Sequence, residues 1–153
     1  MSKELICVQE TGYADYFKKT LKNKVFLLDV KIAESAWDHA INIGTSSYFD
    51  LPDDCWLISS DSVRIGDWLE AYNDDDNYAV SKILRDSVNW PEDGFVNFFA
   101  KRKIVFKVKW KDFILYWDDF LAIEDDCSIV IPESKQRKEA ILFRPLGDVL
   151  KIG

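Results

Sequence analysis

The sequence predicts an α+β fold, in which a single domain over residues 1–153 contains a mainly antiparallel sheet of four to six strands with helices packed on one face. Three observations lead to this prediction. The last third contains strand-length apolar segments separated by turns, as in a meander. Elsewhere apolar residues recur at helical spacing. No repeat, low-complexity tract or linker divides the 153 residues, a length that suits one domain.

Helical and strand-like patterns alternate in the first half of the chain. Apolar residues spaced as on one face of a helix predict four helices, over residues 11–21, 33–43 (ending at Gly44), 63–72 and 78–88. Short apolar runs predict strands over residues 25–30 and 55–59. The Asn-Asp-Asp-Asp-Asn run over residues 73–77 predicts a solvated loop.

The last third shows the clearest pattern. Two strands are predicted on either side of the basic turn Lys101-Arg102-Lys103, over residues 95–100 and 104–110. Asp112 is a predicted helix cap, because apolar residues follow it at positions i, i+3, i+4, i+7 and i+8: Phe113, Tyr116, Trp117, Phe120 and Leu121. Three further strands are predicted, over residues 128–131, 140–143 and 149–152.

The charges are distributed unevenly along the chain. The formal net charge is −7, and residues 50–100 contain 12 acidic residues against three basic ones. This imbalance predicts that the middle segment faces something positively charged. It also weighs against nucleic-acid binding, which needs clustered Lys and Arg. The one such cluster is expected to be a solvated strand edge that discourages aggregation: Lys101, Arg102, Lys103, Lys107, Lys109 and Lys111.

The sequence contains no membrane-span or secretion signal. No apolar stretch approaches the roughly 18–20 residues of a membrane span, and the N-terminus lacks the features of a signal peptide. Cys7, Cys55 and Cys127 are far apart and share no CxxC spacing, which indicates a reducing compartment. We therefore expect a cytoplasmic protein with no membrane partner.

The usual catalytic constellations are absent from the sequence. A Ser-His-Asp or Cys-His arrangement would have to use the single histidine, His39, for which a surface or partly packed position is the simpler interpretation. The runs Asp74-Asp75-Asp76 and Glu124-Asp125-Asp126 lack the spacing of a calcium loop. We expect neither an enzyme nor a bound metal or cofactor.

The aromatic residues fit a core at most positions. Trp68, Tyr72, Trp110, Tyr116, Trp117 and Phe120 stand at core-facing spacing. Trp56 and Trp90 flank the acidic segment, and either a core or an interface position suits them.

The C-terminal segment resembles a small family of uncharacterised bacterial single-domain proteins. The resemblance covers residues 95–153 and rests on two strands, a W-x-x-F-x-x-x-W-x-x-F-L helix over residues 110–121, an acidic turn, and strands that end near a glycine. Because the motif consists mostly of packing residues, it implies the fold rather than the function. In overall character the chain is also similar to the immunity proteins of contact-dependent toxin systems, which are small, acidic, aromatic-rich α+β domains. That similarity implies a protein partner, a cognate toxin domain.

The function predicted from these patterns is toxin neutralisation. An acidic surface with aromatic side chains would cover the active site of a basic toxin domain, such as a nuclease. The predicted partner-binding residues are Asp53, Asp54, Trp56, Asp61, Asp67, Trp68, Glu70, Tyr72, Asp74, Asp75 and Asp76. Two alternatives stay open: a small enzyme built on carboxylates around Glu124, Asp125 and Asp126, with or without the assistance of a metal, and a regulatory protein-binding module.

Overall fold

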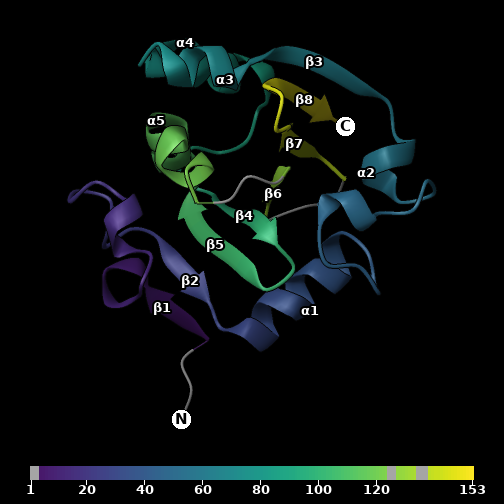
Figure 1. Cartoon of the computed structure of the whole chain (residues 1–153), viewed down its shortest axis with the longest axis horizontal. Coiled ribbons are helices and arrows are strands. Elements are labelled where there is room, and N and C mark those ends of the chain that lie inside the picture. Colours follow the sequence, from purple (N-terminus) through teal and green to yellow (C-terminus); the bar gives the residue numbers. More distant parts are fainter. Residues whose placement is uncertain (1–3, 124–126, 134–137) are drawn as a thin grey trace.

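Eight strands form one antiparallel sheet in the computed structural model of the chain (Figure 1). The structure describes residues 4–123, 127–133 and 138–153. Among these residues the strand order is β1-β2-β5-β4-β6-β7-β8-β3. The strands are β1 (Leu5–Cys7), β2 (Phe26–Leu28), β3 (Ser62–Asp67), β4 (Phe95–Lys101), β5 (Ile104–Lys109), β6 (Ser128–Pro132), β7 (Ala140–Phe143) and β8 (Asp148–Ile152).

The antiparallel α+β class is confirmed, whereas the prediction of four to six strands is wrong. The strands predicted within residues 95–152 are all present. The additional strands lie at the two edges of the sheet. There β1 pairs with β2, and β3 pairs with β8, 80 or more residues away along the chain. Because such pairing depends on distant partners, a local pattern does not reveal it.

The basic turn Lys101-Arg102-Lys103 joins two central strands. On either side of this hairpin, β2 pairs with β5 and β6 pairs with β4. The expectation of a solvated strand edge is therefore wrong, because the edges of the sheet are β1 and β3.

Helices cover both faces of the sheet, so the prediction of helices on one face is also wrong (Figure 1). Side chains alternate along each central strand between two apolar clusters. In β4, Phe98 faces the cluster that contains the helices α3, α4 and α5, and Phe99 faces the cluster that contains α1 and α2. The helices are α1 (Val30–Ala40), α2 (Trp56–Ser59), α3 (Trp68–Asn73), α4 (Asn77–Ser87) and α5 (Trp110–Leu121).

Three predicted elements of the first half differ from the structure. Residues 11–21 form turns with a 3₁₀ helix at Ala14–Tyr16 rather than an α-helix, although Phe17 and Leu21 do reach the core. The predicted strand 55–59 is the short helix α2, because a four-residue apolar run fits a helical turn as well as a strand. The predicted helix 63–72 is divided into β3 and α3.

The helix α5 has a kink that governs how it meets α4. It begins at Trp110, so Asp112 lies in its first turn instead of capping it. Tyr116 has non-helical angles (φ −124°, ψ 28°) inside the helix. Just before this kink, the Ile114 carbonyl accepts a 2.7 Å hydrogen bond from the buried Ser81 hydroxyl of α4. A polar contact between two helices thus accompanies the change of direction.

Candidate functional site

The predicted partner-binding residues fall into two groups on opposite faces of the sheet. Asp53, Asp54 and Trp56 belong to α2 and the turn before it, and α2 packs in the same cluster as α1. The other group follows β3 through α3 to the start of α4, in the cluster of α5: Asp67, Trp68, Glu70, Tyr72, Asp74, Asp75 and Asp76. Asp61 is exposed immediately before β3. The structure therefore does not unite all eleven residues in one site.

Two of the aspartates cap helices. At the end of β3, the Asp67 carboxylate accepts a 3.0 Å hydrogen bond from the Glu70 amide and caps α3. Asp76 caps α4 by accepting a 3.3 Å hydrogen bond from the Ala79 amide. Negative charge at a helix N-terminus is favourable. Asp67 thus fixes the start of α3 and Asp76 fixes the start of α4. Glu70 is exposed on α3, and Asp74 and Asp75 are exposed on the loop between the two helices.

Tyr72 lies in the middle of these acidic residues and is 38% exposed. Its ring makes edge-on contacts with Trp68 and Trp117, at centroid distances of 6.1 and 6.4 Å. Both indoles are fixed by hydrogen bonds from their ring N–H groups, at 2.7 Å to the Arg144 carbonyl and at 3.0 Å to the Asn77 carbonyl. Tyr72 is therefore an exposed aromatic side chain that packs on two indoles of fixed orientation.

A hollow of about 360 Å³ adjoins Tyr72. Its lining includes four residues that the sequence analysis did not assign to a site: Asp15, Tyr16, Asp118 and Asp119. We call these four residues, together with Asp67, Glu70, Tyr72, Asp74, Asp75 and Asp76, the acidic α3 surface. Asp118 and Asp119 follow the buried Trp117 in α5, and their side chains are only 19% and 11% exposed. Only the packing of α4 and of residues 14–18 on α5 shows this, and no local sequence signal could have found it.

Lys18 shows that the carboxylates of this hollow stabilise a cation. Its ammonium group forms a 2.9 Å ion pair with Asp119 and lies 3.9 Å from Asp118. Partial burial alone would lower the pKa of Lys18, but the hydrogen bond and the charges of the two aspartates raise the pKa above its ordinary value. One oxygen of Asp118 accepts a hydrogen bond from the Asn77 amide, while the other is buried and has no hydrogen-bond partner among the described residues. The hollow thus favours positive charge.

Residues 13–153 match the protein family described as "Protein of unknown function (DUF2947)". The chain belongs to this family. No curated protein and no solved structure matches the chain significantly. The resemblance to toxin-immunity proteins stays a prediction.

The basic cluster of this family member is largely engaged in ion pairs. Arg102 binds Asp38 through two hydrogen bonds of 2.9 and 3.0 Å and also contacts Glu34 at 2.6 Å. Lys107 pairs with Glu133 at 2.9 Å, and Lys111 pairs with Asp93 at 2.9 Å. These pairs leave little unopposed positive charge for phosphate groups.

The other sequence-based expectations concern residues with different environments. Trp90 is buried against Trp110, with ring centroids 4.8 Å apart, and is a core residue. His39 is exposed on α1, whereas Trp56 is half-buried on α2. Glu124, Asp125 and Asp126, which the enzyme alternative requires, lie outside the described residues.

Residues 4–123, 127–133 and 138–153 contain no group of three or more His, Cys, Asp or Glu side chains arranged to hold a metal ion. The same residues form no helix with the length and apolar character that a membrane crossing requires.

Proposed function

We propose that the acidic α3 surface binds a basic protein domain and neutralises it, as an immunity protein neutralises its toxin. The observation that carries the proposal is the position of Tyr72, an exposed ring held by two fixed indoles and surrounded by carboxylates. Interface hot spots are enriched in such aromatic side chains, and a ring that is already ordered loses little entropy on binding.

The carboxylates around Tyr72 supply the electrostatic part. Within the described residues, Glu70, Asp74 and Asp75 take part in no ion pair, so their charges act on the surroundings. Opposite charges steer two proteins together and can raise the association rate about 10- to 1,000-fold. Tyr72 would then slow dissociation, because a buried aromatic contact must be broken.

The hollow next to Tyr72 supports a basic partner in particular. Asp118 and Asp119 already stabilise the charged form of Lys18 there. Asp15 and Asp75 lie in the same lining. A lysine or arginine side chain from a partner would find carboxylates at this position.

Co-expression tests the proposal most simply. The partner to use is the C-terminal domain of a large secreted protein encoded immediately upstream. We expect the chain to restore growth and to co-purify with that domain. We expect Tyr72→Ala to weaken binding about 10- to 100-fold, whereas Phe49→Ala, which removes an exposed ring elsewhere, should leave binding unchanged. The proposal is refuted if the unmodified chain fails to restore growth and also fails to co-purify with that domain.

A further inference from the structure

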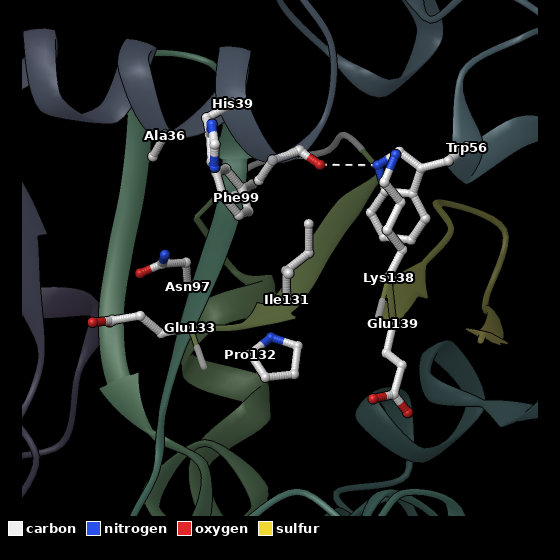
Figure 2. Close-up of a pocket in the computed structure, with 11 residues that line it drawn as sticks. Ala36, His39, Trp56, Asn97, Phe99, Ile131, Pro132, Glu133, Lys138 and Glu139 are labelled. Carbon is white, nitrogen blue, oxygen red and sulfur yellow. Dashed lines mark hydrogen bonds between the residues drawn. The ribbon is translucent and has the colours of Figure 1, made fainter. Parts of the chain in front are cut away.

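A second hollow lies on the face of the sheet that α1 and α2 cover, opposite the acidic α3 surface (Figure 2). Its volume is about 500 Å³, within the roughly 300–1,000 Å³ typical of small-molecule sites. Phe99, Ile131 and Pro132 supply apolar side chains to its lining, and α1 and Trp56 line other sides. Among the described residues, the α-helices on this sheet face are α1, with three turns, and α2, with four residues.

Trp56 forms a rigid planar wall of the hollow. Its indole N–H donates a 2.9 Å hydrogen bond to the carbonyl of Ala40, the last residue of α1 (Figure 2). This bond fixes the orientation of the ring, which is half-buried. The Lys138 ammonium lies 5.7 Å from the ring centroid. Because that ammonium lies over the ring, a planar ligand stacks on this ordered surface by displacing it.

Asn97 is the most unusual residue of the lining. It lies in the central strand β4, paired with Lys107 on one side and with Ile131 on the other. Asparagine is disfavoured in strands, and Asn97 is half-buried, with its side chain in the lining of the hollow. Within the described residues, no hydrogen bond involves the side-chain amide of Asn97. In the part of the chain that the structure describes, this amide is therefore available to a ligand in the hollow.

The polar groups of the lining favour a neutral ligand. Glu133 forms a 2.9 Å ion pair with Lys107. Lys138 and Glu139 carry opposite charges, so together they add no net charge to the lining. Asn97 offers an N–H donor and a carbonyl acceptor side by side, and the exposed imidazole of His39 can do either. An amide of this kind forms paired hydrogen bonds with an edge that carries an adjacent donor and acceptor, as nucleobases do.

We propose that this hollow binds a small, neutral, planar heteroaromatic ligand of the nucleobase or nucleoside class. The ring stacks on Trp56, its hydrogen-bonding edge pairs with the amide of Asn97, and His39 and Lys138 contact the polar substituents. This site is independent of the acidic α3 surface, because it lies on the other face of the sheet.

Ligand-observed NMR with four probes tests the proposal: adenosine, uridine, benzoate and benzylamine. Adenosine or uridine should bind the unmodified chain in preference to the charged rings. Asn97→Val should weaken that binding about tenfold or more, while its melting temperature stays equal to or exceeds that of the unmodified chain, because valine suits a central strand. Asn89→Val, which changes an exposed asparagine outside the hollow, is the matched control and should bind normally.

Several results would overturn the inference. Absence of binding by both nucleosides, or binding of only benzoate or benzylamine, would exclude this ligand class, whether or not any variant folds. Unchanged nucleoside binding by Asn97→Val would show that the amide is not part of a site. A clear fall in the melting temperature of that variant would show that Asn97 serves the fold instead.

Discussion

Ser81→Ala tests how the helices α4 and α5 hold the acidic α3 surface in place. The Ser81 hydroxyl is 2.7 Å from the Ile114 carbonyl and 3.0 Å from the Asn77 carbonyl of its own helix, and the residue is only 5% exposed. The kink at Tyr116 lies two residues after Ile114, and the next residues of α5 are Trp117, Asp118 and Asp119. Losing the hydroxyl should therefore disturb both the packing of the helices and the acidic hollow.

The expected magnitude follows from two opposing effects. A buried carbonyl that loses its partner costs about 1–3 kcal/mol, while alanine is the better helix former by about 0.5 kcal/mol. The free energy of unfolding should thus fall by about 0.5–2.5 kcal/mol, which lowers the melting temperature by about 2–8 °C in a chain of this length. Differential scanning calorimetry measures the change.

The control is Ser87→Ala, which makes the same substitution at the last residue of α4. Its melting temperature should stay within about 1 °C of the unmodified chain, as for most surface changes. If Ser81→Ala is as stable as the Ser87→Ala control, or more stable than the unmodified chain, the proposed role of the hydroxyl at the kink is wrong.

Two further predictions concern the turn before β8 and the basic hairpin. Gly147 has φ +113°, and a Cβ there would lie 2.7 Å from a carboxylate oxygen of Asp67; Gly147→Ala should lower the free energy of unfolding by about 1–3 kcal/mol, and an unchanged urea midpoint would contradict this. The hydrogen bond from Arg102 lowers the pKa of Asp38 below its ordinary value of 3.8, so the stability from this pair is complete above that pH and is lost as the pH falls further. Melting temperatures at acidic pH should therefore fall less steeply in Arg102→Gln than in the unmodified chain, and identical slopes would contradict the assignment.

The sequence predicted the C-terminal half of the fold well, because there the local pattern and the long-range pairing agree. Strand alternation over residues 104–109 and the aromatic stripe of α5 each specify one structure. The prediction for the first half of the chain failed where a segment pairs with a strand that is distant in the sequence. Ile65, Trp68 and Tyr72 fit a helical stripe, yet residues 62–67 pair with β8. The spacing of Asp67 and Glu70 is a capping signal for a helix that begins at Trp68, and it would have located this boundary.

The site was predictable only in part for the same reason. A run of acidic residues indicates where charge is concentrated, so Asp74, Asp75 and their neighbours were found. The run does not indicate which side chains from other segments join it. Asp15, Asp118 and Asp119 reach the hollow through the packing of α5. Trp56 lies apart from Tyr72 because the sheet separates α2 from α3.

The proposed binding by the acidic α3 surface is tested most directly by the rate at which the chain associates with the basic partner domain. Stopped-flow fluorescence would compare about 50 mM with about 500 mM salt, across which the Debye length shortens severalfold. The matched variants are Asp74→Asn/Asp75→Asn on the acidic α3 surface and Asp53→Asn/Asp54→Asn before α2. Asparagine tolerates the positive φ of 55° at residue 75, so the first variant should change charge but not shape.

We expect association of the unmodified chain to slow about tenfold or more at the higher salt concentration. The Asp74→Asn/Asp75→Asn variant should already associate more slowly at low salt, and the Asp53→Asn/Asp54→Asn variant should behave like the unmodified chain. A rate that is the same at both salt concentrations, or one that falls equally in the two variants, would contradict binding by the acidic α3 surface.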